Sequence, residues 1–307
     1  MDILHAIGNT SIVRLRKVVP TDRAEVLVKL EWENPTGSMK DRMARAVIAR
    51  AEENGRLNPG GTVVEYTGGS TGASLALVCA ARGYRLRIVT SNAFSREKRD
   101  QMAALGAELT LVRSEDGLTT RKLILDMIEA ARVLSREPGT YWTDQLHNPD
   151  TITGYHALGE EIWGQTTGEI DAFVHCVGTA ASSRGVATVL KRHKPGIRMV
   201  AVEPAESSVL LGGPAGPHKI EGVGIGYVPP LWDPAMVDEI VAVKTDDAKD
   251  MARRMAREEG LFAGTSSGAN VVAAIRIAER LGPGARVVTL MVDSGLKYLG
   301  TDVYRRG

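Results

Sequence analysis

The chain has 307 residues, and its 38 lysines and arginines almost balance its 37 aspartates and glutamates, which leaves a net charge of +1. That balance argues against a nucleic-acid-binding domain, because such domains rely on an excess of positive charge. The hydrophobic share of 43% and the charged share of 24% are ordinary for a folded protein and exclude disordered and fibrous chains. A chain of this length suggests about two domains.

The sequence also argues against a membrane or secreted protein. Its longest apolar run, residues 73–81, is far shorter than the roughly 20 residues that a spanning helix needs. The first residues lack the basic, apolar and small-residue segments of a secretory signal, so we expect a cytoplasmic location. Cys79 and Cys176 lie in apolar patterns without a CxxC partner, which predicts plain core thiols.

Short runs rich in Val, Ile and Leu alternate with longer amphipathic stretches, a pattern typical of parallel sheets flanked by helices. The predicted strands cover residues 26–30, 62–66, 86–90, 109–112, 172–177, 198–202, 240–243 and 286–291. The predicted helices cover residues 40–54, 73–82, 96–105, 119–135, 152–165, 183–193, 246–259 and 269–280. Ser38 and Asp41 have the spacing of a capping box at the start of the first helix.

Two segments interrupt this pattern. Residues 139–150 contain an aromatic pair and Asn148-Pro149, and they are the best place for a connection between two lobes. Residues 206–230 are rich in glycine and proline and have no helical period. A loop that long is usually functional.

Lys40 falls in the first turn of a predicted helix, near the positive end of the helix dipole. This position disfavours the ammonium form, and only the neutral amine attacks a carbonyl to form a Schiff base. The alternative is a solvated surface lysine whose charge is offset by Asp41.

Two further loops are rich in glycine and small residues. The segment TGGSTG at residues 67–72 joins a predicted strand to a predicted helix, so its backbone N–H groups suit a carboxylate or phosphate. It also fits the G-x-S-x-G nucleophile elbow of serine hydrolases, with Ser70 as the nucleophile. Residues 178–185 follow another strand and form either a phosphate site or an ordinary turn.

The sequence lacks the common motifs of nucleotide-binding and metal-binding sites. The sequence has no G-x-x-x-x-G-K-[ST] motif, and its G-x-G segment at 222–226 does not fit G-x-G-x-x-G, so nucleotide binding is not indicated. It has no H-E-x-x-H motif and no CxxC pair, so we expect no catalytic metal.

Taken in order, these segments resemble the fold-type II pyridoxal phosphate (PLP) enzymes, most closely the cysteine synthase (O-acetylserine sulfhydrylase) family and its relative cystathionine β-synthase. The resemblance spans almost the whole chain. It rests on IGNT at 7–10, VRL at 13–15, KLE at 29–31, NPTGSMKDR at 34–42, TGGSTG at 67–72, Gln145, NP at 148–149, AVEP at 201–204, ES at 206–207, GPHKIEGVG at 216–224, FAGTSSG at 262–268 and DSGLKYL at 293–299.

The resemblance implies two open, twisted, mostly parallel sheets, each flanked by helices, as in the tryptophan synthase β-like fold. It places the active site between two lobes. The smaller lobe would comprise residues 36–148, and the larger would comprise residues 1–35 and 149–307. Family precedent also implies a homodimer.

The resemblance further implies PLP as the cofactor and assigns residues to it. Lys40 would form the Schiff base with PLP and then act as general base. The other cofactor-binding residues would be Ser70, Gly178, Thr179, Ala180, Ala181, Ser182 and Ser294, the last at the pyridine nitrogen. The substrate-binding residues would be Thr67, Gly68, Gly69, Ser70, Thr71, Gln145 and Gly222.

The implied reaction is β-replacement on O-acetylserine or O-phosphoserine by a sulfur nucleophile, giving L-cysteine or a related amino acid. β-Elimination by a serine, threonine or cysteine deaminating lyase is the alternative within the same class. A serine hydrolase built on Ser70 and a non-catalytic binding protein are the alternatives from other classes.

Two positions depart from the family pattern. Ser70 stands where the family usually has asparagine, and Ala180-Ala181 stand where it usually has two glycines. The alanines narrow the backbone angles available to the phosphate loop.

Ser70→Asn should shift activity toward the ordinary cysteine synthase reaction, because it restores the family's usual side chain beside cofactor and substrate. The kcat/KM for O-acetylserine measures this effect. Unchanged or lower turnover of O-acetylserine would contradict this account of Ser70.

Overall fold

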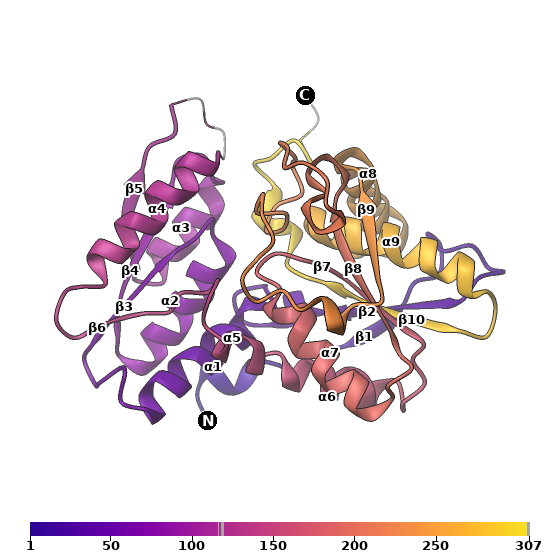
Figure 1. Cartoon of the computed structure of the whole chain (residues 1–307), viewed down its shortest axis with the longest axis horizontal. Coiled ribbons are helices and arrows are strands. Elements are labelled where there is room, and N and C mark those ends of the chain that lie inside the picture. Colours follow the sequence, from indigo (N-terminus) through magenta and orange to yellow (C-terminus); the bar gives the residue numbers. More distant parts are fainter. Residues whose placement is uncertain (116, 118–119, 306–307) are drawn as a thin grey trace.

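The computed structural model describes residues 1–115, 117 and 120–305, and Figure 1 shows two groups of helices and strands side by side. One sheet has six strands in the order β1-β2-β10-β7-β8-β9, and the other has four in the order β5-β4-β3-β6. β1 pairs with β2 in antiparallel fashion, whereas the other neighbouring strands in these two sheets are parallel. The predicted α/β class with two mostly parallel sheets is confirmed.

The strands are β1 Ile12–Arg14, β2 Glu25–Leu30, β3 Thr62–Tyr66, β4 Arg85–Ser91, β5 Glu108–Val112, β6 Thr140–Trp142, β7 Ala172–Cys176, β8 Arg198–Pro204, β9 Glu239–Val243 and β10 Arg286–Met291. The α-helices are α1 Lys40–Glu53, α2 Ser70–Arg82, α3 Arg96–Ala104, α4 Arg121–Leu134, α5 Asp150–Thr153, α6 His156–Gln165, α7 Ala181–His193, α8 Thr245–Arg254 and α9 Thr265–Leu281. All four strands of the smaller sheet fall within residues 36–148, and the lobe boundaries themselves stay a prediction.

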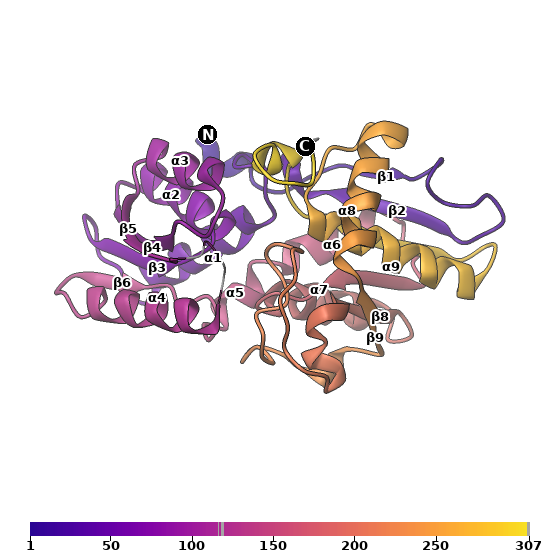
Figure 2. The same cartoon turned by 90° about the horizontal axis from the view of Figure 1, so that it is seen from above.

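Helices cover both faces of each sheet. Figure 2 shows α4 on one face of the smaller sheet and α1, α2 and α3 on the other. Figure 1 shows α6 and α7 on one side of the larger sheet and α8 and α9 on the other. β3 and β7 are buried along their whole length, as expected of parallel strands covered on two faces.

The hydrophobic core follows this layering. One buried cluster runs from α1 and α2 to α6, α7 and one face of the larger sheet, and it includes Val47, Leu75 and Leu158. A second cluster fills the space between the opposite face and α8 and α9. Because the first cluster joins helices that lie beside both sheets, it fixes the position of the two sheets relative to each other.

The structure corrects several predicted elements. β1 and β6 were missed, because three residues are too short to show a period. β6 and the first residue of α5 lie within the predicted connection at 139–150. The single helix predicted at 152–165 is two helices, α5 and α6, with Gly154 and Tyr155 between them. A Cβ on Gly154 would lie 2.8 Å from Met43 Cα, so α1 packs directly against this break.

Some predicted helix ends also differ. α2 and α9 begin earlier than predicted, α8 continues into a π-helical turn at Met255–Glu259, and residues 206–230 include a short 3-10 turn at Val209–Leu211. The helix predicted at 119–135 is α4, and Thr119 itself lies outside the described residues.

The predicted capping box at the start of α1 is wrong. Met39 is the N-cap residue and makes no side-chain capping bond. The Asp41 carboxylate instead accepts hydrogen bonds from the backbone N–H of Thr36, at 2.8 Å, and from the Thr36 hydroxyl. Asp41 therefore holds the turn that precedes the helix.

A buried ionic network anchors α1 just after Lys40. The Arg42 guanidinium donates to Glu31 Oε2 at 2.7 Å and Oε1 at 2.8 Å, and to Glu161 Oε1 at 2.7 Å and Oε2 at 2.8 Å. Lys29 of β2 pairs with Glu161 of α6 at 2.7 Å. Hydrogen bonds and charge attraction from Arg42 and Lys29 outweigh burial and lower the pKa of Glu161 to about 2. The network thus joins α1, β2 and α6.

Arg42→Met should lower the free energy of unfolding by about 3–5 kcal/mol, because it leaves the buried Glu31 carboxylate without its cation. Urea unfolding of the apoprotein at pH 7 measures the loss. Arg50→Met is the matched control, since Arg50 makes an exposed pair with Glu53 and its loss should cost less than about 1 kcal/mol. Equal losses in the two variants would contradict the anchoring role of Arg42.

Candidate active site

The predicted site residues meet where parallel strands of both sheets end. Ser70 begins α2 after β3, residues 178–180 connect β7 to α7, and Ser294 follows β10. Side chains from several parallel strands converge at such a carboxyl edge. Backbone hydrogen bonds join the segment that leads into Lys40 to the segment after β10, from Met39 N–H to Val292 O at 3.0 Å and from Ser294 N–H to Gly37 O at 2.9 Å.

Lys40 is partly buried at this junction. Burial lowers the pKa of its ammonium, and the nearby positive charge of Lys297 lowers it further, whereas Asp293 acts in the opposite direction. The lowered pKa of Lys40 agrees with the prediction from the sequence. Its main cause is burial, whereas the prediction rested on the helix dipole. The surroundings of Lys40 therefore shift its equilibrium toward the neutral amine.

The loop at residues 67–71 is packed tightly under α3. A Cβ on Gly68 would lie 2.8 Å from the Phe94 ring, and one on Gly69 would lie 2.5 Å from Lys98 Cδ. Gly69 also has a φ of +147°, which side chains rarely adopt. Its N–H is held by Thr67 Oγ1 at 3.0 Å, and no side chain caps the first turn of α2. The first N–H groups of α2 are thus available to an anion.

Gln145 is brought to this loop. The Thr71 hydroxyl donates to Gln145 Oε1 at 2.8 Å, and Gln145 Nε2 donates to the carbonyl of Tyr66 at 3.0 Å. The backbone N–H of Gln145 donates to the buried carboxylate of Glu65 at 2.9 Å. Sequence reasoning missed Glu65, although a carboxylate inside an apolar strand was a visible signal.

Glu65 is fully buried on β3. Burial raises the pKa of its carboxyl to about 7, and hydrogen bonds from Thr143, Gln145 and the backbone N–H of Tyr66 limit that rise. The group that holds Gln145 therefore changes charge near neutral pH.

The loop after β7 approaches the long segment 206–230. A Cβ on Gly178 would lie 2.5 Å from the carbonyl oxygen of Gly222, and the N–H of Gly224 donates to Val177 O at 3.2 Å. Ala180 has a φ of +68°, so an alanine adopts the left-handed conformation that favours glycine. Ala180 is the N-cap of α7 and provides no side-chain cap, which leaves an anion site at that helix end.

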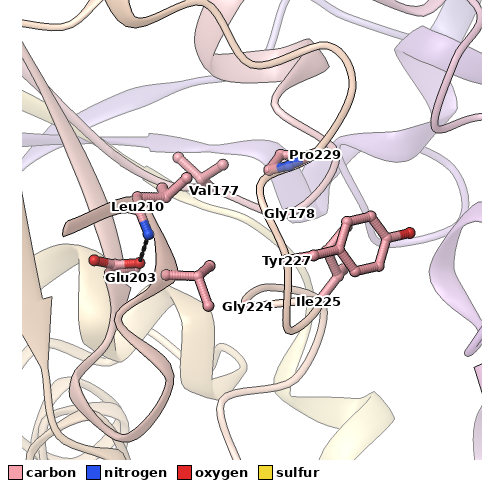
Figure 3. Close-up of a pocket in the computed structure, with 9 residues that line it drawn as sticks. Val177, Gly178, Glu203, Leu210, Gly224, Ile225, Tyr227 and Pro229 are labelled. Carbon is pink, nitrogen blue, oxygen red and sulfur yellow. Dashed lines mark hydrogen bonds between the residues drawn. The ribbon is translucent and has the colours of Figure 1, made fainter. Parts of the chain in front are cut away.

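Figure 3 shows a small pocket beside this loop, with Gly178 and Tyr227 on two of its sides. Glu203 at its far end accepts a hydrogen bond from the N–H of Leu210 at 2.8 Å. Its lining residues are Val177, Gly178, Glu203, Val209, Leu210, Gly224, Ile225, Tyr227 and Pro229.

Ser294 and Asp293 lie next to the start of α1. Ser294 Oγ accepts from the N–H of Leu296 at 3.2 Å, so its own hydrogen is available for a further partner. Asp293 Oδ2 accepts from the Tyr298 hydroxyl at 2.8 Å. Within residues 1–115, 117 and 120–305, Asp293 Oδ1 and Lys297 Nζ are buried and have no hydrogen-bond partner. Sequence reasoning missed both, although it included them in the DSGLKYL segment.

Lys98 connects α3 to the long segment. It forms an ion pair with Glu221, and its Nζ lies 4.6 Å from the centroid of the Tyr298 ring. Its side chain also packs against Gly69. Lys98 therefore contacts elements on both sides of the site, and sequence reasoning did not identify it.

The geometry does not support the hydrolase alternative for Ser70. The Ser70 hydroxyl faces Asp293 Oδ2 at 3.4 Å. In the part of the chain that the structure describes, no histidine lies within hydrogen-bonding distance of it. A serine nucleophile needs an adjacent general base, which a buried acid with a raised pKa does not replace.

The family profile described as pyridoxal-phosphate dependent enzyme matches residues 3–293. The chain belongs to this family. A cysteine synthase of Staphylococcus aureus (strain N315) is 43% identical over 305 residues, which cover 99% of this chain and 96% of that protein.

Solved structures agree with this assignment. Cysteine synthase (OASS) from Entamoeba histolytica has a TM-score of 0.92 and 37% identity, and the match covers 100% of this chain and 91% of that chain. O-ureido-L-serine synthase has a TM-score of 0.91 and 37% identity, covering 98% and 94% of the two chains. The chain is thus a PLP-dependent enzyme of the fold that these proteins share.

The residues present suit PLP. The uncapped start of α7 offers N–H groups for a phosphate, and Gly178 leaves no room for a side chain. Ser294 has a hydroxyl hydrogen to donate, and Lys40 has a lowered pKa. Among the described residues, no cluster of three or more His, Cys, Asp or Glu side chains is arranged to bind a metal, and no helix has the length and apolar character needed to cross a membrane.

Glu65→Gln should flatten the pH dependence of stability between about pH 4.5 and 7. The pKa of Glu65 is raised from 4.5 to about 7 on folding, so the folded state favours the protonated acid and loses stability as pH rises through this window. The full effect of such a shift is about 3 kcal/mol. Urea unfolding at several pH values measures the slope.

Glu137→Gln is the control, because this carboxylate is half exposed and pairs with Arg87 on the surface. It should keep the wild-type slope between pH 4.5 and 7. A Glu65→Gln slope equal to that of the wild type would show that Glu65 is ionised throughout this range.

Proposed function

We propose that the enzyme catalyses β-replacement on O-acetyl-L-serine with sulfide, giving L-cysteine. The observation that supports this most directly is the convergence of three groups: the partly buried Lys40, the uncapped start of α2 and the uncapped start of α7. The full-length similarity to a cysteine synthase supplies the choice of substrate.

In this proposal the substrate carboxylate binds at the start of α2. The N–H groups of Ser70 and Thr71 would receive it, and Thr67, Gly68 and Gly69 would shape the loop. Gln145 would orient the substrate, since its side chain is already bonded to Thr71 and the Tyr66 carbonyl. Ser70 would contact both substrate and cofactor.

The cofactor would lie between Lys40 and Ser294, with its phosphate at the start of α7. Gly178, Thr179, Ala180, Ala181 and Ser182 would hold that phosphate. PLP, when bound, supplies an electron sink that makes the Cα proton of the substrate acidic. The Ser294 hydroxyl would donate a hydrogen bond to the pyridine nitrogen and leave that nitrogen unprotonated.

Lys40 would move the proton. Its lowered pKa favours the neutral amine, which can accept the Cα proton and return it after the β-substituent has been exchanged. Gly222 and the Lys98–Glu221 pair would border the entrance and restrict water.

A homodimer and O-phosphoserine as a second donor stay predictions from the resemblance, and a cytoplasmic location stays a prediction from the sequence pattern. The nucleophile is the least constrained choice, since one structural relative is named for O-ureido-L-serine rather than for cysteine. β-Elimination is the second candidate, because it shares the Cα proton transfer by Lys40 and differs only in the steps after the leaving group is lost.

The test begins with the cofactor and Lys40. Borohydride reduction of the PLP-loaded protein should attach the cofactor covalently to Lys40, which peptide mass spectrometry locates. Lys40→Ala should lower cysteine formation from O-acetylserine and sulfide by at least about 100-fold, since it removes the general base. Lys297→Ala is the matched control, because Lys297 is also buried with a lowered pKa but should not receive the label.

Product analysis completes the test. Cysteine as the main product supports β-replacement. Formation of pyruvate and ammonia in the presence of sulfide, at a rate similar to that of cysteine, would show that the reaction is β-elimination instead. Label on a lysine other than Lys40, or full activity of Lys40→Ala, would overturn the assignment of Lys40.

A further inference from the structure

A buried chain of hydrogen bonds ends on Ser182, in the proposed phosphate loop. It begins at Asn270 on α9, passes through His175 on β7 and reaches Ser182 in the first turn of α7. The three residues are 0%, 3% and 9% exposed. A histidine within a buried strand needs a partner for each ring nitrogen, and this chain supplies both.

The first link has a defined direction. Asn270 Oδ1 accepts from the N–H of Cys176 at 2.7 Å, and Asn270 Nδ2 donates to the carbonyl of Leu290 at 2.9 Å. Reversing the amide would place a donor against an N–H and an acceptor against a carbonyl. Nδ2 therefore also faces His175 Nδ1, at 3.5 Å, so that Nδ1 is the ring nitrogen without a hydrogen.

The second link follows from the charge of the ring. Burial lowers the pKa of His175 to about 3, so the imidazole is neutral. A neutral imidazole has one N–H, and because Nδ1 faces a donor, that hydrogen lies on Nε2. His175 Nε2 then donates to Ser182 Oγ across 2.8 Å.

The third link concerns the hydroxyl. Ser182 Oγ accepts from His175, so its own single hydrogen points away from the ring. Ser182 lies in the uncapped first turn of α7, where the other donors are backbone N–H groups. The neighbouring Ser183 differs, because its hydroxyl donates to the carbonyl of Ala180 at 3.0 Å.

We propose that His175 is a positioning residue that turns the Ser182 hydroxyl into a donor to the cofactor phosphate. The proposal rests on the proposed function, which places PLP at the start of α7. His175 acts only through Ser182, and its neutrality makes the orientation independent of pH above about pH 4.

The test is the dissociation constant of PLP for the apoprotein, from titration followed by absorbance. Ser182→Ala should weaken binding about tenfold, the effect of one hydrogen bond to a charged group. His175→Leu should weaken PLP binding about three- to tenfold. The double variant His175→Leu/Ser182→Ala should bind PLP no more weakly than Ser182→Ala alone. His175→Gln should restore most of the affinity, because its amide nitrogen lies near the position of Nε2. Ser183→Ala is the control and should bind like the wild type.

These outcomes separate the two proposals. Wild-type affinity in His175→Leu, or additive losses in the double variant, would overturn the positioning role while leaving PLP at α7. An apoprotein that does not bind PLP at all would overturn the proposed function as well.

A measurement on the wild type avoids variants that do not fold. With ¹⁵N-labelled histidine, NMR of the holoenzyme between pH 6 and 8 should show His175 as the neutral tautomer with its hydrogen on Nε2. Comparison with His175→Gln identifies its signals among those of the six histidines. A hydrogen on Nδ1, or a charged ring, would overturn the proposal.

Discussion

The buried pairing of Arg42 with Glu31 and Glu161 is the interaction on which the site depends. Burying charges is costly, and these charges stay buried because each carboxylate receives two bonds from one planar guanidinium. Lys40 lies only two residues earlier, in the same helical turn. α1 cannot slide or rotate without breaking the four hydrogen bonds from Arg42 and leaving Glu31 without its cation, so the backbone of Lys40 has a fixed position relative to β2 and α6.

A fixed backbone still needs the right surroundings for the amine. The segment before Lys40 is joined by backbone hydrogen bonds to residues 292 and 294, which brings Asp293 and Lys297 close enough to affect its pKa in opposite directions. Burial is larger than either effect and lowers the pKa. This contact, in which Ser38 lies opposite Asp293, therefore joins the start of α1 to the charged groups that act on the amine.

The sequence predicted most of the fold because the strands of the parallel sheets are short apolar runs. β3 and β10 were predicted with their observed bounds, whereas β1 and β6 were too short to recognise. The two glycine-rich loops were visible because close packing excludes side chains there, as at Gly69 and Gly178. The groups that support these loops were missed, because Glu65, His175 and Asp293 depend on neighbours that are distant in sequence.

Glu65 and His175 nevertheless share a pattern. Each is a polar residue in a fully buried strand. Glu65 holds Gln145, which bonds to Thr71 at the start of α2, and His175 bonds to Ser182 at the start of α7. A buried polar group without a hydrogen-bond partner would lower the free energy of unfolding by about 1–3 kcal/mol. Such a residue therefore needs a partner that forms a hydrogen bond with it. The two differ in charge. The pKa of Glu65 is about 7 and that of His175 about 3, so the support of Gln145 changes with pH near neutrality while the support of Ser182 does not. Any pH sensitivity near neutrality that these supports confer would therefore belong to the substrate side of the site and not to the cofactor phosphate.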